Sequence, residues 1–355
     1  MDADASPARL RSATFGYNGI LFISPFSNEE QIRIMAPSDS QFKITAETAG
    51  AVLSALRKHT DSLTWSAARK HLEGRCIAVN GILCVEEARR VVAGDVIELR
   101  TRPFPPPPKD EDVRILFIDQ DVVVVDKPTG MLSLRHPADV DWKQTKKDRQ
   151  PSLEESVRRL IPRRYDQSSR SGGTELFAVH RIDRETSGIL VFARNESAQA
   201  GLIRQFAAHD ALRKYLCIIP GWLSAQTLES TQIRDRGDGL RGSATQPTDG
   251  HRMVTHVVPL RRFGDFTELE CRLETGRTNQ IRIQLAELGH PICGDVKYRG
   301  PFEQSPVTDE STAPRLALHA AELGFVHPSL STLHRYELPW PKDMLSLIRR
   351  MKSEL

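Results

Sequence analysis

The sequence predicts an α+β protein in which a small module precedes a larger domain. The chain of 355 residues is too long for one ordinary domain. Short apolar runs joined by tight turns alternate with segments of helical pattern, which favours sheets with flanking helices. Residues 103–108 are proline except for one phenylalanine. Because proline fixes φ and favours an extended backbone, residues 103–112 are predicted to be a linker.

The composition is that of a globular protein. Hydrophobic residues make up 39% and charged residues 27% of the chain, which excludes a collagen, a coiled-coil rod and a fully disordered chain. No run approaches the roughly 20 apolar residues of a membrane-spanning helix. The start of the chain lacks the apolar core of a signal peptide. We expect a cytoplasmic protein without a membrane partner, and a monomer.

The cysteines argue against a disulfide framework and against a zinc ribbon. Their number is odd, their spacing is wide, and the chain contains no CxxC pair. This pattern is typical of reduced thiols in a cytosolic protein, so no metal site is predicted from them. They are Cys76, Cys84, Cys217, Cys271 and Cys293.

Residues 46–102 show the pattern of a small helix–hairpin module, and residues 1–45 before it form an extension of unknown role. Two short helices are predicted at residues 51–58 and 66–72, the second with Ser66 as its N-cap and Gly74 as its C-terminal stop. The net charge of the chain is only +3, but a phosphate-binding face needs only local positive charge. Basic residues on or beside the second helix are Arg69, Lys70 and Arg75.

A hairpin follows these two helices. Residues 76–79 and 96–99 predict strands, and Asn80-Gly81 is the dipeptide that best suits a tight turn. The order of two helices, strand and turn resembles the αL RNA-binding module of ribosomal small-subunit protein four. This resemblance implies that the three basic side chains contact RNA, and the alternative is an unrelated helix–hairpin domain.

The larger domain, residues 113–347, begins with a predicted hairpin. Apolar strands at residues 113–118 and 122–125 flank a polar turn, and Pro128 and Gly130 force the chain out of the second strand. Two polar segments rich in turn-forming residues are predicted to be surface insertions, namely residues 138–174 and 232–250.

A charged turn between two apolar strands contains the candidate chemistry. Residues 180–194 form the sequence HRIDRETSGILVFAR. Charged side chains between core strands can pair with one another, so a structural salt-bridge cluster is the alternative to an active site. The segment closely resembles the signature HRLDxxTSGLLLxAK of the RluA-type RNA pseudouridine synthases.

Further blocks of that family occur in the family's order. DKPTGM (126–131) resembles the family's NKPxGL block, and RKYLCIIPG (213–221) resembles KxYxAxVxG. ETGRTNQIRIQL (274–285) with GHPICGD (289–295) resembles TGRTHQIRVHL followed by GHPIxGD. LALHAAELGFVHP (316–328) resembles LxLHAxxLxFxHP. An αL module ahead of the catalytic domain is also common in this family. The resemblance implies the pseudouridine synthase fold, a mixed and largely antiparallel sheet with helices on its outer faces and an active site in a basic cleft.

The resemblance also implies roles for individual residues. Asp183 corresponds to the catalytic aspartate, Tyr215 to the active-site tyrosine, and Arg282 to the basic partner of the aspartate. Each has a structural alternative, because a core tyrosine or a fold-stabilising ion pair uses the same side chains. Residues expected to contact the substrate are His180, Arg181, Arg277, Asn279 and Leu318.

The implied reaction explains this set of side chains. Uridine becomes pseudouridine when the bond from N1 to C1′ breaks and C5 joins C1′, with no atom gained or lost, so no cofactor or metal is expected. An ionised carboxylate can add to C1′ or remove the C2′ proton, and both routes stay open. An arginine keeps the carboxylate charged, and a tyrosine can take the C5 proton. The uridine must also leave the base stack.

Two positions depart from the family pattern. Asn279 and Gln284 stand where the family usually has histidines. Amides can replace the hydrogen bonds of neutral imidazole but not a titrating group. Because the aspartate, tyrosine and arginine remain, we expect an active enzyme.

The expected substrate is structured RNA, most specifically ribosomal RNA of the large subunit, with transfer RNA as the other candidate. The alternative from a different class is a non-catalytic RNA-binding or ribosome-assembly protein that retains the synthase fold. A glycosidase that uses Asp183 and Glu185 is disfavoured. Carboxyl groups on residues two positions apart in a turn have no defined separation, whereas glycosidases hold their two carboxyl groups about 5 to 9.5 Å apart.

Overall fold

The computed structural model describes residues 40–60, 63–164, 174–237, 239–244 and 250–353. In the amino-terminal part, a four-stranded antiparallel sheet has the order β1-β6-β3-β4, and a short pair joins β2 to β5. Its strands are β1 (Ser40–Thr45), β2 (Gly50–Ala51), β3 (Ile77–Val79), β4 (Ile82–Leu83), β5 (Arg90–Val91) and β6 (Val96–Arg100), and its helices are α1 (Val52–Lys58) and α2 (Trp65–Glu73).

Both predicted helices are present, but the predicted N-cap of the second is wrong. Helix α2 begins at Trp65, so the capping residue is Thr64, whose Oγ1 accepts a hydrogen bond from the backbone N–H of Ala67 at 3.1 Å. The predicted stop at Gly74 is confirmed. Thr64 and Ser66 are both good caps. The burial of Ala68 and Leu72 is compatible with either start, so the sequence did not distinguish them.

The Asn80-Gly81 turn forms as predicted. Both residues have positive φ, 51° and 73°, and they join β3 to β4 in a two-residue hairpin. The predicted extension, residues 1–45, lies outside the described residues except for β1, which pairs with β6. The small sheet therefore includes residues upstream of position 46.

The larger part is built on an eleven-stranded sheet within the described residues, in the order β13-β12-β14-β15-β11-β16-β10-β8-β7, with β17 on β16 and β9 on β10. Strand β10 pairs with β16 in parallel, and the other neighbours pair antiparallel. The predicted mixed, largely antiparallel sheet is confirmed. The strands are β7 (Arg114–Ile118), β8 (Val122–Lys127), β9 (Phe177–Ala178), β10 (Ser187–Ala193), β11 (Leu212–Pro220), β12 (Gln226–Ile233), β13 (Gly242–Ala244), β14 (His251–Phe263), β15 (Phe266–Leu273), β16 (Leu318–Val326) and β17 (Leu333–Glu337).

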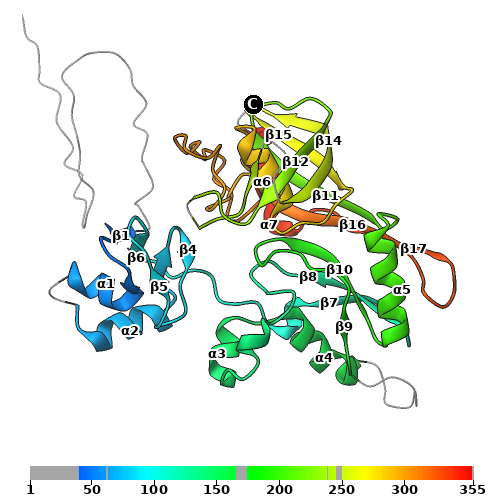
Figure 1. Cartoon of the computed structure of the whole chain (residues 1–355), viewed down its shortest axis with the longest axis horizontal. Coiled ribbons are helices and arrows are strands. Elements are labelled where there is room, and N and C mark those ends of the chain that lie inside the picture. The colour runs from blue at the N-terminus through cyan, green and yellow to red at the C-terminus, as the bar shows by residue number, and fades with distance from the viewer. Residues whose placement is uncertain (1–39, 61–62, 165–173, 238, 245–249, 354–355) are drawn as a thin grey trace, which may run out of the picture. The chain divides into compact units, whose positions relative to one another are not determined.

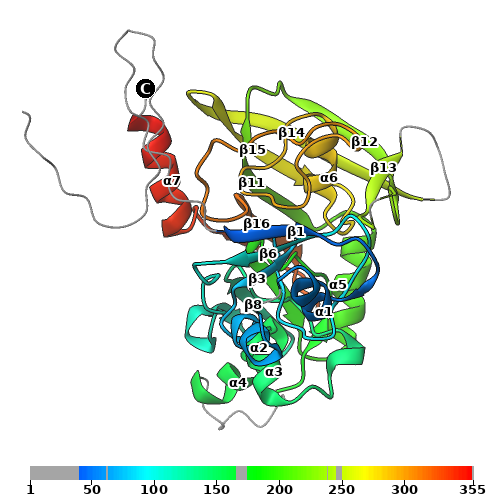
Figure 2. The same cartoon turned by 90° about the vertical axis from the view of Figure 1, so that its left-hand side faces the viewer.

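Helices flank this sheet, and Figure 1 shows β16 running between β11 and β10. Helix α7 lies along one side of the sheet in Figure 2. No helix in the described part of the chain is long and apolar enough to cross a membrane. The helices are α3 (Gln144–Arg149), α4 (Leu153–Arg164), α5 (Glu196–Ala207), α6 (Gln280–Glu287) and α7 (Lys342–Ser353), with 3₁₀ turns η1 (Asp110–Asp112) and η2 (Pro137–Asp139).

The prediction that residues 138–174 form a surface insertion is wrong for α4. Although this helix is polar overall, Leu153, Val157, Leu160 and Ile161 recur on one face and are buried in the main core. The apolar stripe was hidden by the charged residues between its members. In the second predicted insertion, residues 232–250, β13 extends the edge of the sheet.

The parallel contact between β10 and β16 requires a glycine. Gly188 pairs with Ala320 and has a φ of 119°, and a Cβ at this position would collide with the Ala320 backbone. Beside it, Ser187 Oγ lies 2.9 Å from His319 Nδ1. The close approach brings the loop before β10 next to the start of β16, and that junction positions the candidate site.

We predict that Gly188→Ala lowers the free energy of unfolding by about 3 kcal/mol, because the methyl group forces two backbones apart at a positive φ. Urea unfolding of the full chain measures this value. Gly201→Ala in α5 is the matched control, since its Cβ would make only ordinary contacts with Pro328 at 3.4 Å and alanine favours a helix. Equal stability of the two variants would contradict the role given to the close contact.

Candidate active site

A buried lysine, Lys127, holds the loop that contains Asp183 through hydrogen bonds to backbone carbonyl groups. Lys127, at the end of β8, is fully buried, and its Nζ donates hydrogen bonds to the carbonyls of Pro128 (3.0 Å), Met131 (2.7 Å) and Arg184 (3.1 Å). Three carbonyl acceptors match the three N–H donors of an ammonium group. Burial lowers the pKa of Lys127 to about 7, against the opposing effect of nearby carboxylates.

Two hydroxyl groups fix the same loop on either side of Asp183. Ser133 Oγ donates to the Ile182 carbonyl at 2.6 Å and accepts from the Ile182 N–H at 3.1 Å. Thr129 Oγ1 donates to the Glu185 carbonyl at 2.7 Å. The segment after β8 therefore anchors the backbone around the aspartate before any substrate is present.

Arg282, on α6, lies beside Asp183 but is bound most tightly to another residue. Its Nε and Nη2 donate to the two carboxylate oxygens of Asp295 at 2.7 and 2.8 Å. Its Nη1 lies 3.8 Å from Asp183 Oδ2. Burial alone would lower the pKa of Arg282, but the hydrogen bonds and charge of Asp295 raise it. The predicted pairing with Asp183 is thus a looser contact, and sequence reasoning missed Asp295, the last residue of the GHPICGD block.

Asn279 and Gln284, the two departures from the family pattern, have different surroundings. Asn279 precedes α6 with a left-handed φ of 59°, and its Oδ1 accepts from Arg282 Nη1 at 3.0 Å. Gln284 is buried between α6 and the sheet, where its Oε1 accepts from Thr255 Oγ1 at 2.6 Å. The first amide orients the arginine, and the second joins the helix to β14.

Asp183 and Glu185 are neighbouring carboxyl groups whose pKa values are shifted in opposite directions. Burial raises the pKa of Asp183, and the Glu185 charge adds to this, while Arg282, Arg181 and Lys297 oppose it. Burial also acts to raise the pKa of Glu185, but the nearby cations lower it overall. Environments that shift the pKa values of two neighbouring carboxyl groups in opposite directions are common where acid–base chemistry occurs.

Tyr215 lies on β11 and is 8% exposed. Burial raises the pKa of its phenol to about 12, against the charge of Arg213, while Asp183 acts in the same direction as burial. The hydroxyl group is therefore neutral near pH 7 and can both donate and accept a hydrogen bond.

His180 and Arg213 form a wall of the site that does not titrate near neutral pH. His180 Nε2 accepts from the Val191 N–H at 3.2 Å, and its ring stacks on Phe206 with centroids 4.6 Å apart. Burial lowers the pKa of His180 to about 3, and Arg213 acts in the same direction. Arg213 donates to the Glu274 carbonyl at 2.7 Å.

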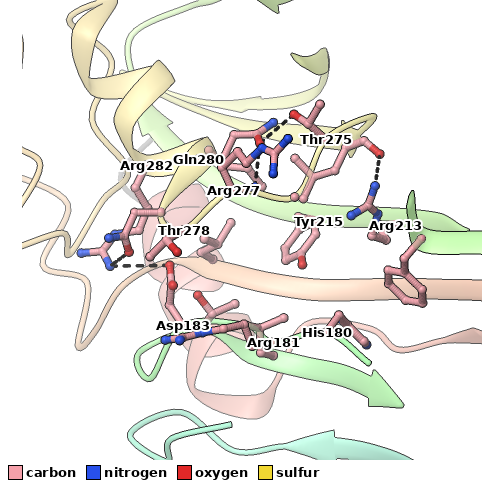
Figure 3. A pocket seen from close by; sticks show the side chains of 18 of the residues that line it. His180, Arg181, Asp183, Arg213, Tyr215, Thr275, Arg277, Thr278, Gln280 and Arg282 are labelled. Carbon is pink, nitrogen blue, oxygen red and sulfur yellow. Dashed lines mark hydrogen bonds and ion pairs between the residues drawn. The ribbon is translucent and has the colours of Figure 1, made fainter. Parts of the chain in front are cut away.

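The candidate site is one cavity of about 510 Å³, whose lining residues include His180, Arg213 and Tyr215 (Figure 3). All eight site residues predicted for the larger domain line it, and they come from segments far apart in the sequence. Sequence reasoning missed the far wall, to which α5 contributes Ile203 and Phe206 and β11 contributes Arg213. The predicted residues that the cavity brings together are His180, Arg181, Asp183, Tyr215, Arg277, Asn279, Arg282 and Leu318.

The three basic residues predicted for the amino-terminal module are not part of this cavity. Arg69 Nε donates to Glu87 Oε1 at 2.8 Å, and Lys70 is exposed. Arg75 is half-buried, and its backbone has a positive φ of 60°. Their contact with RNA stays a prediction.

One group of three side chains in the described part of the chain could offer metal ligands, namely Asp119, Asp121 and His327. The Leu330 N–H donates to His327 Nδ1 at 3.2 Å, and His327 Nε2 lies 2.9 Å from Asp119 Oδ2. Both ring nitrogens of His327 therefore have partners within the protein. These contacts join the β7–β8 turn to the segment after β16, and the turn itself is closed by Asp119 Oδ1, which accepts from the backbone N–H groups of Asp121 and Val122 at 2.8 Å.

Residues 121–287 match the sequence model of the RNA pseudouridylate synthase family. An uncharacterised RNA pseudouridine synthase of Bacillus subtilis is 38% identical over 244 residues, which cover 68% of this chain and 74% of that protein. The ribosomal large subunit pseudouridine synthase D of Nitrosomonas europaea is 31% identical over 300 residues, covering 81% of each chain.

A solved structure supports the same fold. Human RNA pseudouridylate synthase domain containing 4 superposes with a TM-score of 0.51 at 20% identity, covering 67% of this chain and 92% of that chain.

We predict that Lys127→Met lowers the free energy of unfolding by about 3 kcal/mol, because three carbonyl groups lose their donor. Ser133→Ala, which removes a smaller part of the same anchor, should cost about 1 to 2 kcal/mol. Urea unfolding compares the two variants with the wild type. A Lys127→Met protein as stable as the wild type would show that the loop does not depend on the lysine.

Proposed function

Because the chain belongs to the RNA pseudouridylate synthase family, and is therefore an isomerase that converts uridine in RNA to pseudouridine, we propose that it acts on ribosomal RNA of the large subunit through Asp183. The observation that supports the catalytic proposal is the convergence of Asp183, Tyr215 and Arg282 in one cavity. The proposed substrate follows relatives named ribosomal large subunit pseudouridine synthase D.

In the proposed reaction, a uridine leaves the base stack and enters the cavity. The Asp183 carboxylate then either attacks C1′, so that the bond to N1 breaks, or removes the C2′ proton as that bond breaks. The freed uracil turns, and C5 bonds to C1′ as the ester between Asp183 and C1′ breaks on the first route, or as Asp183 returns the proton to C2′ on the second. The hydrogen at C5 is released to solvent as a proton, and N1 gains a proton from solvent, so the reaction consumes no protons overall.

Arg282 keeps Asp183 ionised in this scheme. Because Asp295 binds two of its nitrogens, the third nitrogen stays beside Asp183 without a conformational search. A fixed positive charge opposes the effect of burial on the carboxylate, and a charged carboxylate is required on either route.

Tyr215 is assigned to the proton transfer at C5. Its phenol is neutral near pH 7, since burial raises its pKa to about 12. It can therefore accept the C5 proton while it gives its own proton to solvent, which supplies the proton that N1 gains, so that no free phenolate is needed. Leu318 forms an apolar wall beside it.

Exposed arginines at the cavity would contact the RNA backbone. Arg181 and Arg277 are both exposed and both line the cavity. Guanidinium groups at the entrance suit phosphate contacts on either side of a flipped nucleotide.

We predict that Asp183→Asn reduces turnover by about 1,000-fold or more, since the amide removes the reacting charge. Tritium release from RNA labelled at uracil C5 measures the reaction. Glu185→Gln is the matched control, because it removes a neighbouring carboxylate that does not line the cavity. Retained turnover in Asp183→Asn would refute the assignment, and no turnover in the wild type would favour the non-catalytic alternative.

Two variants should displace the acid limb of the pH–rate profile in opposite directions. Activity falls with pH as Asp183 becomes protonated. Arg282→Met removes a charge that lowers the pKa of Asp183, so the limb should move to higher pH. Glu185→Gln removes a charge that raises this pKa, so the limb should move to lower pH. A uniform loss of rate at every pH in Arg282→Met would mean that the arginine acts by positioning alone, and Arg282→Lys separates charge from geometry.

The substrate can be identified in cells with and without this gene. Pseudouridine is mapped by carbodiimide treatment and primer extension across large-subunit ribosomal RNA and across transfer RNA. We expect one or more stops in large-subunit RNA to disappear with the gene. Stops lost only from transfer RNA would contradict the proposed substrate while leaving the assignment of Asp183 intact.

A further inference from the structure

The amino-terminal module presents an exposed tryptophan whose ring is already held in place. Trp65, the first residue of α2, is 42% exposed. The guanidinium of Arg57, on α1, lies over the ring, 4.4 Å from its centroid. Arg57 Nε also donates a hydrogen bond to the Leu63 carbonyl at 3.0 Å. Helix α1, through Arg57, and the segment just before α2, through Leu63, therefore hold the Trp65 side chain at the surface without burying it.

A groove begins at this ring. It has a volume of about 620 Å³ and is lined by Ala51, Leu53, Ser54, Trp65, Arg69, Glu87 and Ala88. Arg57 is not among these lining residues in the described part of the chain. The Arg57 guanidinium thus covers the part of the Trp65 ring that lies outside the groove. The part of the ring that lines the groove stays accessible to a ligand. This groove is separate from the cavity that contains Asp183.

The charges around the groove suit a polyanion. Arg57 lies in the last turn of α1 and Lys70 in the last turn of α2, whereas Lys58 is paired with Glu47 at 3.2 Å. The acidic residue in the groove, Glu87, is paired with Arg69 at 2.8 Å. A ligand with an aromatic face and attached negative charge would therefore meet the ring and the surrounding cations together.

We propose that Trp65 stacks against an unpaired base of the RNA substrate. The inference rests on the proposed function, because it assumes that this chain binds RNA. Every base has a flat π face that can stack on an aromatic ring, and this contact depends little on sequence. Paired bases hide these faces within the helix, so the groove favours a single-stranded loop over a duplex. Arg57 adds a cation–π contact that keeps the ring in its binding orientation.

Stacking and phosphate contacts can be separated by their dependence on salt. A phosphate contact releases counterions, so its loss flattens the plot of log affinity against log salt. A stacked base releases none, so the loss of Trp65 should lower affinity at every salt concentration and leave the slope unchanged. This difference distinguishes the ring from the basic residues beside it.

The experiment uses the full chain and two labelled probes, a single-stranded 12-nucleotide oligoadenylate and a blunt 12-base-pair RNA duplex. Trp65→Ala should weaken binding of the single strand by about 10-fold or more, with an unchanged salt slope and little effect on the duplex. Trp65→Phe, which keeps a ring, should recover most of the affinity. Lys70→Ala should instead flatten the salt slope for both probes.

Trp222→Ala is the matched control, because Trp222 is also exposed, at 52%, and lies outside both the groove and the catalytic cavity. It should bind both probes as the wild type does. The inference is overturned if Trp65→Ala binds the single strand normally, or if Trp65→Ala and Trp65→Phe both lose affinity for both probes together with thermal stability, as a packing residue would. Wild-type tritium release tests the proposed function separately, so the two can fail independently.

Discussion

The pair of hydrogen bonds between Arg282 and Asp295 is the interaction on which the candidate site depends. Asp295 is buried, and its Oδ1 also accepts the backbone N–H groups of Lys297 and Tyr298. This carboxylate therefore neutralises Arg282 and closes the loop after α6 at the same time. With two nitrogens bound to Asp295 and the third shared with Asn279, the guanidinium has one orientation, and its remaining charge faces Asp183. Removal of either partner would leave an unpaired buried charge, which is strongly destabilising.

The rest of the site is built by holding backbone segments close together. Gly188 allows β10 to approach β16, and Lys127 holds the turn that precedes β10. Lys127 and Gly188 constrain the two ends of the short segment that follows Asp183, residues 184–188, so the buried core determines the position of Asp183. This arrangement suits a reaction in which the substrate base must turn while the carboxylate stays in place.

The surroundings of the cavity shift the pKa values of its titratable side chains in different directions. Among the described residues, Asp183 is the carboxyl group that lines the cavity, beside several cations. His180 and Tyr215 stay neutral near pH 7, because burial lowers the pKa of one to about 3 and raises that of the other to about 12. In the described part of the chain, the charged side chains that line the cavity are therefore one carboxylate and several arginines, and His209 also lines it.

The sequence by itself determined the local elements and predicted eight candidate site residues. Periodicity and turn chemistry predicted the β3–β4 turn, the strands around residues 113–125 and both helices of the module, and the resemblance selected eight residues that meet in one cavity. Only the tertiary structure decided that Asp295 binds Arg282, that α4 is a core helix, and that Phe206 and Arg213 complete the cavity. Local patterns record which face of an element is apolar. They do not record which distant side chain meets a buried charge, because that depends on how the sheet brings separate segments together.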